Sequence, residues 1–220
     1  MEKPIQQRAV KTKAKILATA IRLFARDGFQ GARIDDLAKG AKVNRQRIYA
    51  YFGNKKKLFE TAMLEVFAGA NAEDDKLLEL DDKVLPELTL ILLRHYLDVH
   101  RKHPALHRMI GWANLQLRET PQWLKDIKKK SFTHLRQLYR NGQERGIFAE
   151  QVSFDVYIFT LLAVTYFYTA NRITATQTTS PELFTSEGIN QLVEQTAAMI
   201  GRNSFFNHEP HEQTRKFFLF

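Results

Sequence analysis

The chain has 220 residues, of which 44% are hydrophobic, and it contains no cysteine. This length is enough for one compact domain or two small ones, and the absence of cysteine excludes disulfides and thiol chemistry. No run reaches the roughly 18 uninterrupted apolar residues of a membrane span, and the first residues contain no apolar signal segment. We therefore expect a soluble cytoplasmic protein with no membrane partner.

Positive charge is concentrated at the amino-terminal end. Residues 1–58 carry 15 Lys and Arg against 4 Asp and Glu, whereas residues 59–220 carry 18 against 20. Such an uneven distribution is expected of a protein that binds a polyanion such as nucleic acid. A charged run alone is more often a solvated face, so the charge supports a DNA-binding motif without replacing one.

The first helix is predicted to follow a loose basic arm of residues 1–11. Thr12 is its predicted amino-terminal cap, and Gly28 lies just past its predicted end. Its apolar residues recur at helical spacing, so they should pack against the two helices that follow. These apolar residues are Ile16, Ala20, Leu23 and Phe24.

Residues 33–57 are predicted to form two short helices joined by a tight turn. Gly40 suits the turn, because glycine adopts a left-handed conformation without steric cost. Asn44 is the predicted cap of the second helix, which covers roughly Arg45 to Tyr51. This is the pattern of a helix-turn-helix, which presents its second helix to the major groove of DNA. The apolar face of the helix before the turn carries Ile34, Leu37 and Ala38.

The polar side chains around this second helix are predicted DNA contacts. Arginine pairs with guanine edges and glutamine with adenine edges, so Arg45, Gln46 and Arg47 are predicted to read bases. Two tyrosines and a lysine beside the start of the next helix can bond to phosphate oxygens, which fix the register on the duplex. The predicted set is Arg33, Asn44, Arg45, Gln46, Arg47, Tyr49, Tyr51 and Lys55.

An ordered pattern extends over the stretch from Thr12 to Lys57. It reads I16-L17-x-x-A20-x-x-L23-F24, G28-F29, I34-x-x-L37-A38, A41-x-V43 and I48-Y49-x-Y51-F52-x-x-K55-x-x-L58. The stretch resembles the DNA-binding domain of the tetracycline-repressor (TetR) family of bacterial transcriptional regulators. Arg33 stands where that family prefers Thr or Ser, and Lys42 and Gln46 replace common glycines. The alternative interpretation is a structural three-helix unit with a solvated basic face.

The remainder of the chain is predicted to be helical. A fourth helix, Lys55 to Ala70, has Asn54 as its predicted cap and is the predicted lever between two domains. The acidic stretch at residues 72–83 is a predicted connection. Prolines fit the first turn of a helix, and three of them mark further helix starts. The last of these helices covers about Gln122 to Glu144 and stops before Gly146. The three prolines are Pro86, Pro104 and Pro121.

Two later helices indicate a second subunit. The helix from Phe154 to Arg172 is apolar on almost all sides, so it must be buried on two sides. The next helix, about Glu187 to Ile200, has one apolar stripe that includes Val193. In the TetR family the last two helices commonly pair with their copies in a second subunit, so the resemblance and the burial argument both favour a homodimer. The alternative is a central core helix in a monomer.

Two groups of side chains are candidate small-molecule or metal sites. His103 and His107 have the spacing of a zinc-peptidase helix, but Pro104 stands where the catalytic Glu would be. We therefore expect no metal, no catalytic site and no cofactor. A mixture of aromatic and neutral polar residues is predicted to line an effector pocket, with plain helix core as the alternative. That mixture is Trp112, Asn114, Gln116, Tyr157, Tyr166 and Tyr168.

We therefore expect an all-α protein with a three-helix DNA-binding domain at residues 1–54. A larger helical effector-binding and dimerisation domain follows at residues 55–202, with a tail at residues 203–220. The resemblance implies a homodimeric repressor that binds a pseudo-palindromic operator in double-stranded DNA and is released by a small-molecule effector. The alternatives are a DNA-binding architectural protein without an effector, and an enzyme whose helical domain uses His100, His103 and His107.

Overall fold

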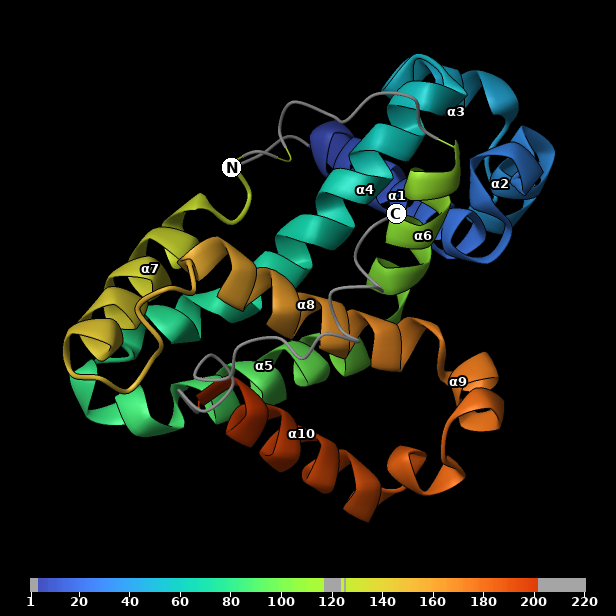
Figure 1. Ribbon diagram of the computed structural model, residues 1–220. Helices are drawn as coiled ribbons and strands as arrows, with labels where there is room; N and C mark the ends of the chain where they lie inside the picture. Colours follow the sequence, from blue (N-terminus) through green and yellow to red (C-terminus); the bar gives the residue numbers. More distant parts are fainter. Residues whose placement is uncertain (1–3, 117–123, 125, 202–220) are drawn as a thin grey trace, which may run out of the picture.

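The computed structural model describes residues 4–116, 124 and 126–201 (Figure 1). These residues form helices and turns and no strand, which confirms the predicted all-α class. Pro121 and the tail at residues 203–220 lie outside the described residues. The helices are α1 (Pro4–Gly31), α2 (Ile34–Ala41), α3 (Arg45–Phe52), α4 (Lys55–Ala72), η1 (Glu73–Glu79), η2 (Asp82–Glu87), α5 (Leu88–Lys102), α6 (Pro104–Gln116), α7 (Lys129–Glu144), α8 (Phe154–Ala170), α9 (Arg172–Thr178), η4 (Pro181–Phe184) and α10 (Ser186–Gly201), where η denotes a 3₁₀ helix.

The helices are arranged around α4 and α5. In Figure 1, α1–α3 lie together at the upper right, and α4 runs from them towards the opposite side of the molecule. The helix α5 lies between α8 and α10, and α6 stands beside α1. We call α1–α3 the amino-terminal head and α4–α10 the body. No helix formed by the described residues is both long and apolar enough to cross a bilayer.

A first hydrophobic core joins the head to the body. The predicted stripe of α1 is buried against α2 and α3, as expected, and Ile16, Leu37 and Ile48 are at most 1% exposed. The same core continues into α4 and reaches Leu106 and Met109 of α6. The head therefore has no separate hydrophobic core, and the domain boundary between residues 54 and 55 stays a prediction.

A second core lies within the body and is formed by α5, α7, α8 and α10. Leu92, Leu135 and Leu161 are fully buried there, and the rings of Tyr139 and Tyr157 stack with centroids 4.4 Å apart. Stacked aromatic pairs of this kind add to the stabilisation from buried area alone. The body is thus held together by one face of α8, which includes Tyr157 and Leu161.

The structure corrects the amino-terminal prediction. The helix α1 begins at Pro4, so residues 4–11 are helical rather than a loose arm. Thr12 lies inside this helix, where its hydroxyl donates to the carbonyl of Arg8 at 2.8 Å, so it is no cap. The sequence over these turns is rich in Ala, Gln, Lys and Arg, which favour helix, and proline is tolerated in a first turn.

The turn between α2 and α3 also differs from the prediction. Gly40 lies within α2, and a Cβ there would be only 2.8 Å from Cγ2 of Thr19 on α1. Lys42 takes the left-handed conformation instead, with φ of 53°. Glycine at position 40 therefore permits close helix packing, and the turn falls on the lysine that replaces a common glycine of the TetR family.

Two helix ends in the body differ from prediction, and a third agrees with it. The helix α7 begins at Lys129 rather than Gln122, because residues 126–128 form a turn. The helix α8 ends at Ala170, and a new short helix, α9, begins after Asn171. The predicted stop of α7 before Gly146 is confirmed, since that glycine has a φ of +69°.

The observed turn between α2 and α3 predicts opposite effects on stability for Lys42→Gly and Gly40→Ala. Lys42→Gly should raise the free energy of unfolding by about 0.5–1 kcal/mol. The substitution relieves the strain of a left-handed lysine, and this gain is larger than the loss caused by a more flexible unfolded chain. Gly40→Ala should lower it by roughly 1 kcal/mol or more, because overpacking against Thr19 exceeds the gain in helix propensity. Urea denaturation of the three proteins measures both changes. Stabilisation by Gly40→Ala would show that position 40 is not a packing glycine.

Candidate functional site

The helix α3 is positioned by one cap and two apolar anchors. The Asn44 side chain accepts a hydrogen bond from the backbone N–H of Arg47 at 2.8 Å, as a helix cap does. Ile48 and Phe52 are 1% and 7% exposed and point into the first core. The opposite side of this short helix is therefore presented to solvent. Its exposed residues include Arg45, Gln46, Arg47 and Tyr49.

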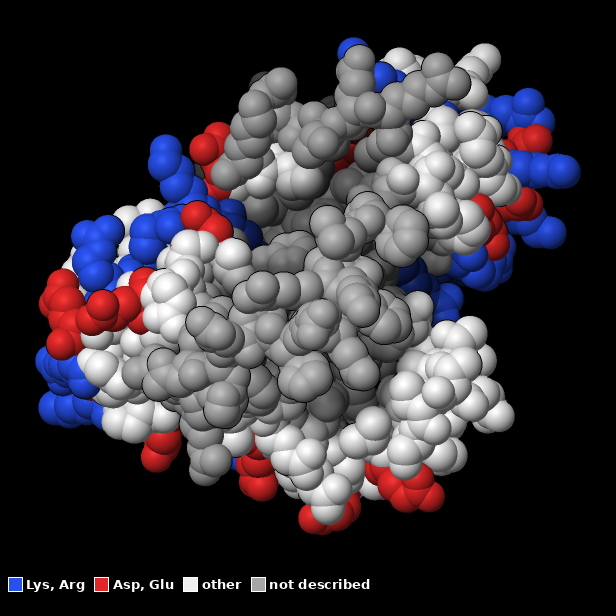
Figure 2. All heavy atoms as spheres, in the orientation of Figure 1, with Lys and Arg blue, Asp and Glu red and all other residues white. Residues whose placement is uncertain are grey.

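An ion pair crosses the turn in front of α3. Arg45 Nε contacts Asp35 Oδ1 of α2, and both side chains remain more than half exposed. Arg33, just before α2, is exposed and extended, and its side chain does not cap that helix. In Figure 2, Lys and Arg side chains project from the upper right, where α2 and α3 lie, with a few acidic ones among them. The surface around α3 is thus positive, and acidic side chains of α2 partly neutralise it.

The two remaining predicted DNA contacts are half-buried. Tyr51 packs against the first core, and Lys55 lies over the ring of Phe29 with its Nζ 4.9 Å from the centroid. Lys55 Nζ also donates to the carbonyl of Gln30 at 3.4 Å, and burial lowers the pKa of this ammonium. Asn54 caps α4 as predicted, by accepting from the N–H of Lys57 at 2.9 Å. Lys55 therefore ties the start of α4 to the end of α1.

The helix α6 contacts the same end of α1. Gly28 has a φ of +70° and ψ of −177°, and a Cβ there would lie 2.7 Å from the ring of Trp112. Gln116 Oε1 accepts a hydrogen bond from the N–H of Phe29 at 2.8 Å. Trp112 and Gln116, predicted as pocket residues, thus hold the head against the body. The sequence pattern carried no signal of this contact, because the residues are more than 80 positions apart.

The structure does not bring the predicted pocket residues together. Asn114 is exposed, and Tyr157 is buried in the second core, where its hydroxyl shares a 3.0 Å hydrogen bond with Thr89 Oγ1. Trp112 and Tyr166 line a cavity of about 530 Å³ between α1, α6, α8 and α9, which we call the junction cavity. Tyr168 lines a different cavity. The volume of the junction cavity falls within the range of ligand pockets.

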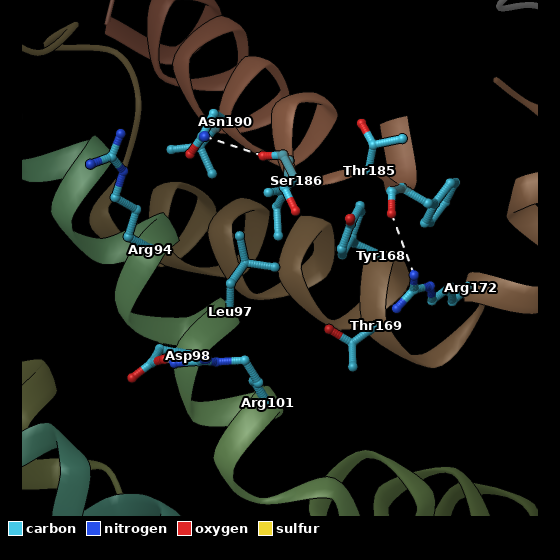
Figure 3. A pocket seen from close by; sticks show the side chains of 13 residues that line it. Arg94, Leu97, Asp98, Arg101, Tyr168, Thr169, Arg172, Thr185, Ser186 and Asn190 are labelled. Atoms are coloured by element: carbon cyan, nitrogen blue, oxygen red, sulfur yellow. Dashed lines mark hydrogen bonds and ion pairs between the residues drawn. The ribbon is translucent and has the colours of Figure 1, made fainter. Parts of the chain in front are cut away.

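That second cavity, of about 600 Å³, lies between α5, α8 and α10 (Figure 3). Leu97 points into it between two arginines of α5, and Ser186 and Asn190 come from the opposite helix. Arg101 is paired with Asp98, whereas Arg172 donates to the carbonyl of Phe184 at 3.4 Å. The cavity is open along one side and combines an apolar floor with charged edges.

Several buried polar side-chain atoms of the body have no hydrogen-bond partner. Within the described residues, each buried side-chain nitrogen or oxygen that lacks such a partner belongs to the stretch from Asn71 to His107. Leaving one unpaired costs about 1–3 kcal/mol, so such atoms are unusual in a folded protein. Burial lowers the pKa of His100 to about 4 and also lowers that of His107. The atoms are Asn71 Oδ1, Tyr96 OH, His100 Nδ1, His103 Nε2 and His107 Nδ1.

The histidines do not form a metal site. Among the described residues, no group of three or more His, Cys, Asp or Glu side chains is placed to hold a metal ion. His103 Nε2 lies 3.9 Å from Glu73 Oε1, while the rings of His100 and His107 have centroids 6.4 Å apart. This arrangement offers no support for the enzyme alternative.

A buried carboxylate organises the neighbouring part of the body. Asp74 is 1% exposed, and it accepts from Lys128 Nζ at 2.6 Å and from Ser131 Oγ at 3.1 Å. Its other oxygen lies 2.9 Å from His95 Nε2. Burial alone would raise the pKa of Asp74, but the hydrogen bond from His95 and the charge of Lys128 lower it overall. The acidic stretch predicted only as a connection thus joins η1, α5 and α7.

Comparison with known proteins decides the family. The model described as "Bacterial regulatory proteins, tetR family" matches residues 16–62, and "Tetracyclin repressor-like, C-terminal domain" matches residues 90–200. The HTH-type transcriptional repressor NicS of Pseudomonas putida is 30% identical over 174 residues, which cover 76% of this chain and 80% of that protein. This chain belongs to the TetR family. The HTH-type transcriptional repressor SCO4008 of Streptomyces coelicolor is 31% identical over 157 residues, or 70% of this chain and 76% of that protein.

A solved TetR-family structure shows the same fold. The TetR-family transcriptional regulator HI0893 of Haemophilus influenzae superposes with a TM-score of 0.66 at 21% identity, over 89% of this chain and 100% of that one. Because its family models and curated relatives are those of TetR-family repressors, the chain is a DNA-binding transcriptional regulator, with an amino-terminal helix-turn-helix and a helical carboxy-terminal domain. Membership of this family explains why the ordered sequence pattern from Thr12 to Lys57 contains α2 and α3.

The contact of α6 with Gly28 predicts a severe effect for one small substitution in this TetR-family chain. Gly28→Ala should cost about 1–3 kcal/mol of unfolding free energy from backbone strain, and the clash with Trp112 should add to this. Gly146→Ala is the matched control, because Gly146 has a similar φ of +69° but no neighbouring atom within 4 Å of its Cβ position. Thermal denaturation of both variants measures the difference, and equal losses would contradict the proposed contact.

Proposed function

We propose that this TetR-family protein is a cytoplasmic homodimeric repressor, which binds a pseudo-palindromic operator and is released by a small-molecule effector. The observation that carries the proposal is α3, where a capped and anchored helix exposes Arg45, Gln46 and Arg47 in succession. The printed names of the relatives in Pseudomonas and Streptomyces describe both as transcriptional repressors, which supports repression here.

The side chains of α3 have the chemistry for base reading. Arginine pairs bidentately with guanine and glutamine with adenine, so the first turn of α3 sets the preferred sequence. Tyr49 and Tyr51 bind phosphate oxygens, and Arg33 and Lys55 add positive charge on either side. Asn44 acts by capping α3 rather than by reading bases. Because Lys55 is partly buried over Phe29, its contribution to affinity is smaller than that of a free lysine.

The outer face of α8 supports a homodimer. Val156, Phe159 and Phe167 recur at helical spacing on the side away from the second core, and they are 57%, 70% and 56% exposed. A stripe of large apolar side chains of this kind indicates an interaction surface. Val193, predicted for the same surface, is only 3% exposed and packs inside its own subunit, so α10 contributes through residues such as Met199.

The effector acts by changing the spacing of the two heads. Two copies of α3 reach successive major grooves about 34–36 Å apart. An effector that binds better to another head spacing lowers operator affinity, and only by its differential affinity for the two states. The contacts of α6 with the end of α1 provide a second connection to the head besides α4. Operator weakens effector binding by the same factor, typically about 5- to 150-fold.

The DNA-reading proposal is tested on an operator selected from genomic fragments. Arg45→Ala and Gln46→Ala should each lose about 1–3 kcal/mol of binding free energy on the operator and much less on random DNA. Arg140→Ala, a change at an exposed residue of α7, is the control and should alter neither. Fluorescence anisotropy at fixed salt gives the affinities of the wild type and the three variants for both DNAs. Equal losses on both sequences would remove α3 from sequence reading.

The dimer proposal is tested by sedimentation. Phe159→Glu combined with Phe167→Glu should convert a micromolar dimer into a monomer, since unpaired charge would be buried at the interface. The helical circular dichroism should not change, because both side chains are exposed in the single subunit. Val10→Glu, a comparable change on α1, is the control. A wild-type protein that sediments as a monomer at this concentration would contradict the proposal.

A further inference from the structure

The cavity between α5, α8 and α10, which we call the α10 cavity, has a surplus of positive charge. Among the described residues, the charged side chains that line it are three arginines and one aspartate. In Figure 3, Arg94 lies at one end of the cavity and Arg172 at the other. Its volume of about 600 Å³ suits a small molecule, and a concave surface of one charge sign concentrates ions of the opposite sign. The α10 cavity is therefore a candidate site for an anion.

Two of the three arginines are already paired with carboxylates. Arg101 contacts Asp98, whose other oxygen accepts from Lys102 Nζ at 2.9 Å. The hydrogen bonds from Lys102 and Arg101 lower the pKa of Asp98 to about 2, so this carboxylate stays ionised at neutral pH. Arg94 lies 4.0 Å from Glu194, and both side chains are at least 60% exposed, so this second pair is weak.

Arg172 differs from the other two arginines in its partners. It forms no ion pair among the described residues, and the hydrogen bond that its guanidinium donates goes to the carbonyl of Phe184 at 3.4 Å. Its positive charge acts on the neighbouring Tyr168, where it opposes the rise in pKa that burial causes. A guanidinium can bind a planar carboxylate through two parallel hydrogen bonds, which are stronger than bonds between neutral groups. Arg172 is therefore the residue of the α10 cavity best suited to bind a carboxylate.

The floor of the α10 cavity is apolar. Leu97 points into the cavity from α5, and Val193 of α10 is 3% exposed. Ile189, one turn before Val193, is half-buried and also lines the cavity. At the end where Arg172 lies, the ring of Tyr168 stacks on that of Phe184 with centroids 4.9 Å apart. An aliphatic chain placed on this floor would be removed from water together with the side chains beneath it, which favours binding.

We propose that the α10 cavity binds an amphipathic carboxylate. Its head pairs with Arg172, and its aliphatic chain lies over Leu97, Ile189 and Val193. An uncharged ligand would leave the guanidinium without a charged partner, and a cation would be repelled by it. A small inorganic anion would leave the apolar floor in contact with water. The inference goes beyond the proposed operator response, because it uses only residues of the body.

The rival arrangement places the carboxylate in the junction cavity. Thr169 and Arg172 line both cavities, so a ligand could approach Arg172 from either side. Arg108 lines the junction cavity but not the α10 cavity, whereas Asn190 lines the α10 cavity but not the junction cavity. Both side chains are exposed, so substitutions at these two positions test the place of the ligand without disturbing a core.

The first experiment titrates the full-length protein with decanoate, 1-decanol and decyltrimethylammonium, by calorimetry at pH 7.5 and below the concentrations at which these compounds aggregate. The wild type should bind decanoate at least about tenfold more tightly than 1-decanol, because hydrogen bonds between charged groups are stronger than those of a neutral hydroxyl. Decyltrimethylammonium should bind more weakly than 1-decanol. Equal affinity for decanoate and 1-decanol, or no binding of decanoate, would overturn the proposal.

The second experiment locates the ligand by substitution. Asn190→Asp adds negative charge to the α10 cavity and should weaken decanoate binding about threefold or more. Gln191→Glu is the matched control, because Gln191 is exposed on the same helix but does not line the cavity. This control should leave the affinity within about twofold of wild type. Arg172→Gln should remove the preference for decanoate over 1-decanol, while Arg108→Gln should keep it.

Sedimentation and circular dichroism of each variant show whether it keeps its assembly and its helices. If Arg172→Gln loses helical signal, the comparison of Asn190→Asp with Gln191→Glu still decides, because both side chains are exposed. An affinity for decanoate that falls in Arg108→Gln but not in Asn190→Asp would place the ligand in the junction cavity and contradict the proposal. A wild type that does not bind decanoate, with an altered oligomeric state in Asn190→Asp, would show instead that a second copy of the chain fills the α10 cavity.

Discussion

The structure depends on the packing of α6 against the end of α1. The hydrophobic core of the head does not close on itself but continues through α4 to Leu106 and Met109 of α6. At its edge, the ring of Trp112 occupies the space that only glycine leaves at position 28. The orientation of the DNA-reading helices is therefore fixed by a body helix as well as by the chain connection at α4. A displacement of α6 would therefore displace the head as well.

The sequence allowed the local features of the head to be predicted. Asn44 and Asn54 cap the helices that they were expected to cap, and Ile48 is buried as its position required. Caps and apolar periodicity depend on residues a few positions apart, so a single sequence contains them. It was not predictable that Gly40 would pack against another helix and Lys42 would form the turn, because this depends on how closely α2 approaches Thr19 of α1.

The body was less predictable for the same reason. Tyr157 and Tyr166 occupy similar sequence contexts in α8, yet one is buried in the core and the other lines the junction cavity. Asp74 belongs to an acidic run that looks solvated, although its partners are 21 to 57 residues away. Helical periodicity identifies apolar faces, but it does not say which neighbour covers a face or which polar residue is enclosed. The residues that line the junction cavity were therefore not recognisable as a group from the sequence.

The ion pair between Arg45 and Asp35 bears on how such a regulator finds its operator in a genome. An exposed pair of this kind contributes about 1 kcal/mol or less. A well-placed guanine can therefore replace Asp35 as the partner of Arg45, whereas DNA that lacks this base gains little from breaking the ion pair. In the proposed docking, Asp35 would also place negative charge beside the duplex and would lower affinity for arbitrary DNA. Because the genome offers about 10⁶–10⁹ competing sites, weaker binding to wrong sequences raises occupancy of the operator as effectively as stronger binding to the right one.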